Sequence, residues 1–156
     1  MTARHELREL RDAREDFDGQ PTRPASWPAQ LPGAFYRAVQ EFNRGEYYRC
    51  HETLEAIWIP ETGTVRELYQ GALQISVGCF HLTQRANRRG AISLLERGAR
   101  RLDRAVSVNP DVSSLYDINW SGLIAAADRL QFHLRQGGND SDIGYVHSLL
   151  PTISRP

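Results

Sequence analysis

The sequence contains no lysine: all nineteen basic residues are arginine, and nineteen acidic residues balance them. Such a neutral chain lacks the basic excess that is typical of proteins that bind nucleic acid or anionic membranes through their overall charge. No apolar run approaches the ~20 residues that span a bilayer. The opening stretch MTARHELRELRDARED is charged throughout, unlike a signal peptide. We therefore expect a cytoplasmic protein that does not enter the membrane.

Cysteine is also scarce, with only Cys50 and Cys79 in the chain. They are far apart, follow no metal-binding spacing, and fall on apolar helical stripes. We expect two buried, reduced thiols rather than a disulfide or a cysteine-ligated metal. A glycine-rich phosphate loop and a G-x-S-x-G motif are missing too, so these patterns indicate neither a nucleotide site nor a serine hydrolase.

No stretch alternates in the way that predicts a β-strand, whereas five stretches have helical periodicity. Short connections between the first four favour antiparallel neighbours. The sequence therefore predicts an all-α fold, a single-domain antiparallel helical bundle of about five helices. Glycine, asparagine and proline punctuation places these helices at about residues 33–44, 46–59, 64–86, 88–107 and 120–136.

Outside the bundle domain, residues 33–136, the chain divides into two flanking parts. Residues 1–32 form an N-terminal arm and a proline-rich linker, which Trp27 and Leu31 are expected to pin to the body. Residues 137–156 form a C-terminal tail, and its stretch IGYVHSLLPTI is apolar enough to pack back onto the bundle.

The second predicted helix carries the motif H-E-x-x-E, one residue away from the H-E-x-x-H of zinc peptidases. At about 100° per residue, His51 and Glu55 share one face at the edge of an apolar arc, while Glu52 points toward solvent. His51 and Glu55 are one turn apart, which is close enough to share a proton or a metal ion.

The third predicted helix is apolar or small over most of its circumference, yet Gln70, Gln74 and His81 form a narrow polar stripe on it. Each buried polar group without a partner costs about 1–3 kcal/mol. We therefore expect this stripe to face His51 and Glu55 of the second helix, forming a buried polar seam. Two glycines flank the stripe and would let a neighbouring backbone come close: Gly71 and Gly78.

Three interpretations of this seam remain open. It is a structural hydrogen-bond network that sets helix register, or a pocket for a small ligand or partner. In the third interpretation, a divalent metal binds His51, Glu55 and His81, because three such ligands with one open position are typical of catalytic zinc. Glu52 would then be the general base. A two-carboxylate centre of Glu52 and Glu55 has less support, since nothing marks a substrate cleft.

The fourth predicted helix is rich in arginine: residues 85–104 hold seven, against two acids. Such a cluster could contact an acidic partner or a phosphate backbone. We favour a solvated face that pairs with the acidic N-terminal arm, because the whole chain is neutral and no aromatic residue interleaves the cluster. Nucleic acid is therefore not the expected partner.

Four motifs occur in order along residues 35–106: F-N-x-G-x-Y-x-x-x-H-E-x-L-E-x-x-W, Q-G-x-x-Q, H-L and N-x-x-G-A. Together they resemble a small all-helical family known as domain of unknown function 309. The resemblance implies a compact helical bundle and cytosolic proteins of bacteria, archaea or plastid lineages, with no established activity. Its motifs include all five residues of the expected seam: His51, Glu55, Gln70, Gln74 and His81.

These observations favour a non-enzymatic binding or scaffold protein without a cofactor, whose partner is a protein or a second copy of the chain. The alternative is a metal-dependent hydrolase that takes its ligands from the H-E-x-x-E helix. The candidate site residues for either function are His51, Glu52, Glu55, Gln70, Gln74 and His81.

Overall fold

The computed structural model describes residues 27–107, 115–137 and 143–156. The predicted arm and most of the predicted linker lie outside these residues. Within them the chain is helical and has no strand, which confirms the all-α bundle. None of its described helices is long and apolar enough to cross a membrane. The elements are α2 (Gly33–Asn43), α3 (Tyr47–Trp58), α4 (Arg66–Gln84), α5 (Arg88–Val106), the 3-10 helix η1 (Leu115–Asp117), α6 (Trp120–Arg135) and α7 (Ile143–Ser148).

The helix boundaries follow local backbone chemistry. Gly45 lies in the turn between α2 and α3. Its φ is +76°, a left-handed conformation that glycine adopts without strain. Asn87, which we predicted as the end of the third helix, instead caps α5, because its side chain accepts from the Gly90 N–H at 3.0 Å. Asn119 caps α6 in the same way. All five predicted helices are present, and α7 is an additional short helix within the predicted tail.

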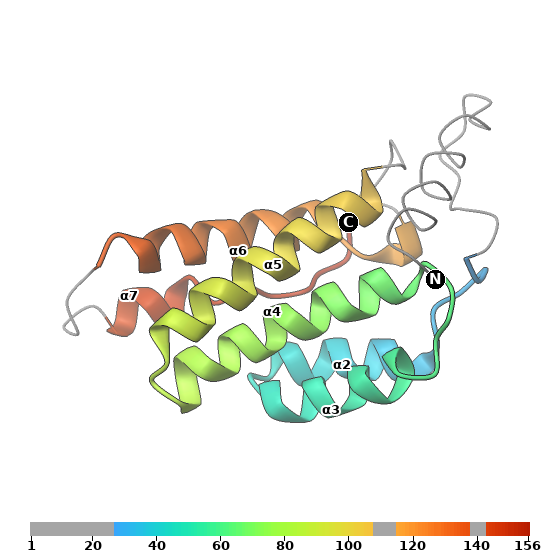
Figure 1. Cartoon of the computed structure of the whole chain (residues 1–156), viewed down its shortest axis with the longest axis horizontal. Coiled ribbons are helices and arrows are strands. Elements are labelled where there is room, and N and C mark those ends of the chain that lie inside the picture. Colours follow the sequence, from blue (N-terminus) through green and yellow to red (C-terminus); the bar gives the residue numbers. More distant parts are fainter. Residues whose placement is uncertain (1–26, 108–114, 138–142) are drawn as a thin grey trace.

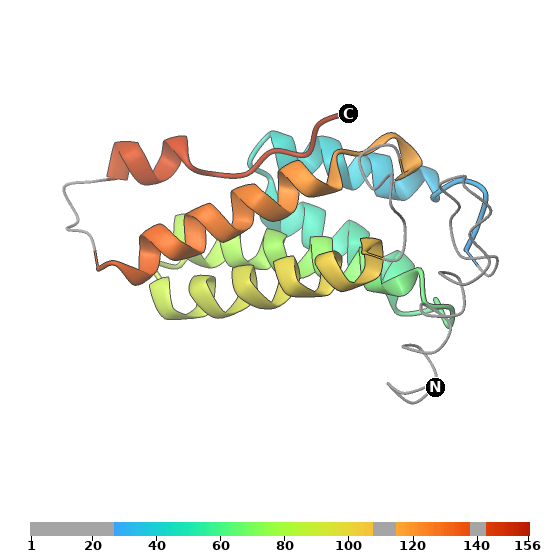
Figure 2. The same ribbon diagram turned by 90° about the horizontal axis from the view of Figure 1, so that it is seen from above.

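Consecutive helices pack against one another from α2 to α6, and α4 makes its most extensive contacts with α5. The two views show that the C-terminal segment runs between α2 and α6 (Figures 1 and 2). It is tied there because the Asn43 side chain of α2 bonds the backbone of Ile153. The tail therefore packs back as predicted and closes the bundle between its first and last long helices.

Large aromatic side chains fill the end of the bundle where α2, α4 and α6 meet. The ring of Phe35 lies 5.8 Å from that of Tyr69 and 5.9 Å from that of Trp120. Trp27 is buried and donates its indole N–H to Thr64 Oγ1 at 2.7 Å. Leu31 is buried as well. The end of the linker is thus pinned to the body, as the sequence predicted.

Between α2, α3 and α4 the core contains several polar groups. Cys50 and Cys79 are both buried and free, which confirms the prediction for the two thiols. The Glu41 carboxylate is buried and accepts from the Thr53 hydroxyl at 2.7 Å, and Ser76 donates to the Tyr47 carbonyl oxygen at 2.8 Å. These hydrogen bonds satisfy groups that would otherwise be costly to bury.

Glycines bring α4 and α5 unusually close together. A β-carbon placed on Gly98 would lie 2.8 Å from the Gly71 carbonyl oxygen and 3.0 Å from the Ile75 nitrogen. One on Gly71 would lie 2.6 Å from the Leu102 side chain. The prediction that a neighbouring backbone approaches Gly71 is confirmed, and that neighbour is α5.

Replacing Gly98 with alanine should destabilise the bundle, because the new methyl group meets backbone atoms that cannot rotate away. We expect Gly98→Ala to lower the free energy of unfolding by about 1–3 kcal/mol, the usual range for overpacking, as measured by urea denaturation. Gly33→Ala is the matched control, since nothing lies within 4 Å of a β-carbon there. Equal stability of the two variants would contradict the close packing of α4 on α5.

The buried cysteine thiols and tyrosine hydroxyls predict a loss of stability at alkaline pH. Burial raises the pKa of Cys50 from 9.0 to about 12 and that of Tyr69 from 10.0 to about 12. It also raises the pKa of Cys79 and Tyr47. Above pH ~9 the unfolded chain therefore binds fewer protons than the folded chain, so the free energy of unfolding falls as pH rises.

We expect the free energy of unfolding, measured by urea denaturation, to hold steady from pH 7 to ~8.5. Above pH ~9 it should drop by up to about 1.4 kcal/mol per pH unit for each fully titrating group, and the urea midpoint should fall with it. Cys79→Ala serves as the comparison, and its midpoint should fall less steeply. A midpoint that is constant up to pH ~10.5 would contradict this burial.

Candidate functional site

The H-E-x-x-E motif lies on the outer part of α3. His51 Nε2 and Glu55 Oε2 are 3.4 Å apart, with 27% and 42% of the two side chains exposed. The sequence correctly placed these groups on one face, within reach of each other. Glu52 is exposed, as predicted. A solvent-accessible pair at this spacing contributes only about 0.3–0.5 kcal/mol to stability.

Gln74, the middle residue of the predicted polar stripe, turns toward α5 rather than α3, and so does Glu67 on the same helix. Arg101 of α5 donates to Glu67 Oε2 at 2.7 Å and to Gln74 Oε1 at 3.3 Å. The side chains of Arg101 and Glu67 are only 23% and 14% exposed. The expected pairing of this stripe with His51 and Glu55 is therefore wrong for Gln74, which α5 satisfies instead.

Gln70 is partly buried, and no hydrogen bond joins it to His51 or Glu55 among the residues described. The helical period gives the angle of each side chain around its own helix, but it does not say which neighbouring helix covers that angle. Two helices flank α4, and Gln74 pairs with α5 rather than with the predicted α3.

His81 lies near the C-terminal end of α4, and its Nδ1 is 3.4 Å from the Asn87 amide nitrogen. Among the described residues, ring contacts through Tyr48 and Phe80 connect it to His51. Tyr48 lies 5.8 Å from His51 and 5.5 Å from Phe80, and Phe80 lies 6.1 Å from His81. We call Tyr48, His51, Phe80 and His81 the aromatic row.

The predicted metal ligands are not gathered in one place. Across residues 27–107, 115–137 and 143–156, no group of three or more His, Cys, Asp or Glu side chains could hold a metal ion. His51 and Glu55 supply two such groups, and His81 contacts the α4–α5 turn. The structure thus offers a histidine–carboxylate pair rather than a three-ligand centre.

A pocket of about 530 Å³ opens beside the aromatic row, where α3 begins and α4 ends. Tyr48 and Phe80 contribute aromatic surface, and Glu46 and Glu52 contribute carboxylates. Tyr48 is 54% exposed. Tyr48 and Phe80 were not among the predicted site residues, because an aromatic residue in a helix usually marks the core. The signal that could have found Tyr48 is its position next to Tyr47: adjacent residues point about 100° apart, so both cannot be buried on one side.

We call the face of α3 and α4 that runs from Trp58 and Arg66 at one end to Tyr48, Phe80 and the pocket at the other the α3–α4 surface. Arginine side chains lie against aromatic rings at both of its ends. The guanidinium of Arg85 is 5.5 Å from the centre of the Phe80 ring, and that of Arg66 is 5.0 Å from the centre of the Trp58 ring. In addition, Arg49 forms an exposed pair with Glu46 at 3.5 Å. This surface therefore has the chemistry that attracts guanidinium groups.

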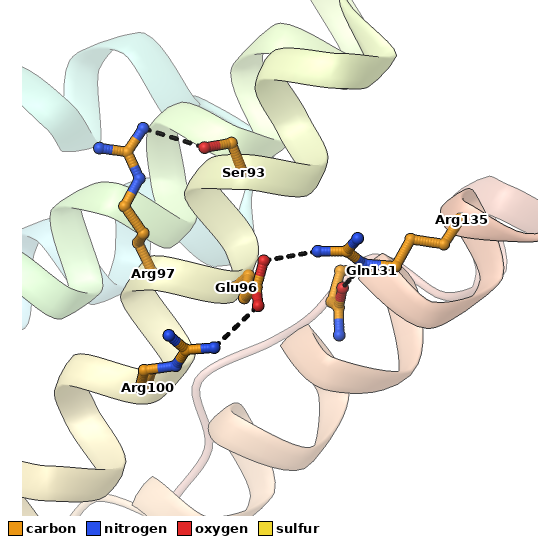
Figure 3. Close-up of polar contacts among 6 residues, drawn as sticks. All are labelled: Ser93, Glu96, Arg97, Arg100, Gln131 and Arg135. Carbon is orange, nitrogen blue, oxygen red and sulfur yellow. Dashed lines mark hydrogen bonds and ion pairs between the residues drawn. The ribbon is translucent and has the colours of Figure 1, made fainter.

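Several arginines of α5 are engaged within the bundle. Glu96 accepts from both Arg100 and Arg135, and Arg97 donates to Ser93 (Figure 3). Arg101 binds Glu67, as described above. The predicted pairing with the N-terminal arm concerns residues outside the described part of the chain. The bonds within the bundle leave fewer arginines of α5 for phosphate groups.

A second pocket of about 330 Å³ lies between α5 and α6 and contains Glu96, Asp103 and Asp128. Burial raises the pKa of Asp128, and the nearby charges of Asp103 and Glu96 raise it further. Arginines neutralise Glu96 here, and the carboxylates are not arranged for a metal. We therefore take the α3–α4 surface as the candidate site.

The comparisons with known proteins support the resemblance. The family model described as "Domain of unknown function (DUF309)" matches residues 35–94, which is less than half of the chain but contains most of α2 and the whole of α3 and α4. All four sequence motifs lie in this segment. No curated protein and no solved structure matches the chain.

The network around Arg101 should behave as part of the packing. Removing its guanidinium leaves Glu67 and Gln74 without their partner at low exposure, which costs about 1–3 kcal/mol. We expect Arg101→Ala to lower the free energy of unfolding by that amount in urea denaturation. Arg97→Ala, on the same helix but removing an exposed side chain that donates to Ser93, should change it by less than about 0.5 kcal/mol. A stable Arg101→Ala variant would return Gln74 to the list of candidate site residues.

Proposed function

We propose that this protein, whose residues 35–94 match the domain of unknown function, is a non-enzymatic binding protein that docks a cationic segment of another protein on its α3–α4 surface. One observation carries the proposal: Tyr48 is 54% exposed while its ring contacts His51 and Phe80 at the edge of the 530 Å³ pocket. Exposed aromatic side chains beside a pocket are typical of binding hot spots.

The charge of the pocket supports a cationic partner. Glu52 is exposed and forms no ion pair with any described residue, whereas Glu46 is paired with Arg49. An incoming arginine could pair with Glu52 while stacking on Tyr48. The geometry of Arg85 over Phe80 supports this mode, because it is the same contact made within the chain. Stacking of this kind is worth about 0.5–2 kcal/mol, depending on desolvation.

The distribution of polar groups favours binding over hydrolysis. The bonds from Arg101 to Gln74 and Glu67 use these groups for packing, and His51 and Glu55 are partly open to solvent. The metal-dependent hydrolase that the sequence also predicted, with His51, Glu55 and His81 as ligands and Glu52 as base, has less support, because His81 contacts Asn87. A cytoplasmic location and a homo-oligomer stay predictions from the sequence.

A peptide of four arginines, acetylated and amidated at its ends, tests the proposal. In a titration followed by NMR chemical shifts, we expect saturable changes at Tyr48, Glu52 and Phe80. Tyr48→Ala should weaken binding about 3- to 30-fold, equivalent to the energy of a cation–aromatic contact. Glu52→Gln should weaken it as well, and binding should fall as salt is raised, since the charges are exposed.

Tyr145→Ala is the matched control, because Tyr145 of α7 is 53% exposed and outside the pocket. It should bind the peptide like the unmodified chain. Circular dichroism verifies that each variant is folded. If the shifts gather elsewhere, or if Tyr48→Ala binds as tightly as Tyr145→Ala, the α3–α4 surface is not the docking site.

A further inference from the structure

The C-terminal residues after α7 lie in an extended conformation between α2 and α6 (Figure 2). The first and last long helices of the bundle form this position, whereas α3 and α4 form the candidate site. The segment has no regular secondary structure from Leu150 onward, yet it is held at several points. Its mode of attachment is that of a bound peptide rather than that of a packed helix.

Asparagine side-chain and backbone groups hold the main chain of this segment. The Asn43 amide donates to the Ile153 carbonyl oxygen at 2.8 Å, and its oxygen accepts from the Ile153 N–H at 2.7 Å. The Asn119 N–H donates to the Ser154 carbonyl oxygen at 2.8 Å. These three hydrogen bonds are all made to main-chain atoms of two consecutive residues. The same bonds could therefore form with any extended segment that lies in the same register.

The side chains of the segment alternate as in a strand. Pro151 and Ile153 are buried, whereas Thr152 and Ser154 between and after them are exposed. Ile153 is only 6% exposed and belongs to the hydrophobic core. Alternate side chains of an extended peptide enter a surface in this way, where pockets give specificity and the main-chain bonds give affinity.

We propose that the space between α2 and α6 is a binding groove for an extended partner segment with the pattern Pro-x-Ile, and that the chain's own residues 149–156 occupy it at rest as a tethered ligand. Asn43 forms hydrogen bonds with the backbone of the isoleucine, and the isoleucine side chain is buried in the adjacent hydrophobic core. The Arg155–Asp117 pair, 3.2 Å apart and well exposed, adds only a surface contact.

Tethering explains how the groove stays filled. A covalently linked segment acts at an effective concentration of the order of millimolar, so a partner peptide must compete with it. Asn43 lies inside the segment that matches the domain of unknown function, whereas residues 149–156 lie outside it. The groove and its resting occupant thus come from different parts of the chain, and the occupant can be changed without altering the groove.

The experiment uses the full chain with Ile153→Asp, which places a charge on the buried anchor and should free the groove. The probe is a fluorescent synthetic peptide, LLPTISRP, with the sequence of residues 149–156. Fluorescence anisotropy should show that Ile153→Asp binds it at least 10-fold more tightly than the unmodified chain. Adding Asn43→Ala to Ile153→Asp should weaken binding at least 10-fold, and a peptide with aspartate in place of the isoleucine should not compete.

Circular dichroism must show that the variants are folded, and Ile153→Ala is the milder substitute if Ile153→Asp is not. A folded variant with no saturable binding of the peptide, or with binding that is unaffected by Asn43→Ala, would overturn the proposal. If the unmodified chain instead forms dimers that Asn43→Ala abolishes, the groove belongs to the tail of a second copy, and the resting arrangement proposed here is wrong. None of these outcomes depends on the α3–α4 surface.

Discussion

The close approach of α4 and α5 is the constraint on which the rest of the bundle depends. Gly71 and Gly98 have no side chains of their own, so the two backbones meet where these residues lie. Because Arg101 follows Gly98 by one turn of α5, its guanidinium is brought within reach of Glu67 and Gln74 on α4. The glycine contact therefore decides both how tightly the helices pack and which polar groups pair across them. It also assigns the opposite flank of α4 to α3, where Ser76 bonds the Tyr47 carbonyl.

This pairing of helices changes the role that we assign to the polar residues in the matched motifs, from ligand binding to helix packing. A glutamine on a mostly apolar helix must find a partner, and Gln74 finds it in a neighbouring helix rather than in a ligand. The groups that remain open to solvent are the His51–Glu55 pair and the aromatic row beside the pocket. Functional chemistry is better sought in these groups, since packing does not account for an exposed tyrosine.

The bundle has two candidate binding surfaces, of which one is open and the other is occupied by the chain itself. The pocket at the start of α3 is open, while the space between α2 and α6 is filled by the chain's own C-terminal residues. The first presents aromatic rings and carboxylates, and the second presents an asparagine amide that bonds a backbone. These surfaces suit different partners, a cationic side chain in one case and an extended apolar segment in the other.

The sequence alone determined the five long helices, the turn at Gly45, the burial of Cys50 and Cys79, and the shared face of His51 and Glu55. These features depend on backbone propensity and on periodicity within one segment, which are local properties. Only the tertiary structure decided that Gln74 faces α5, because periodicity fixes an angle around one helix and not the neighbour that covers it. It likewise decided that Asn43 holds Ile153, since a contact between residues 110 positions apart leaves no trace in local patterns.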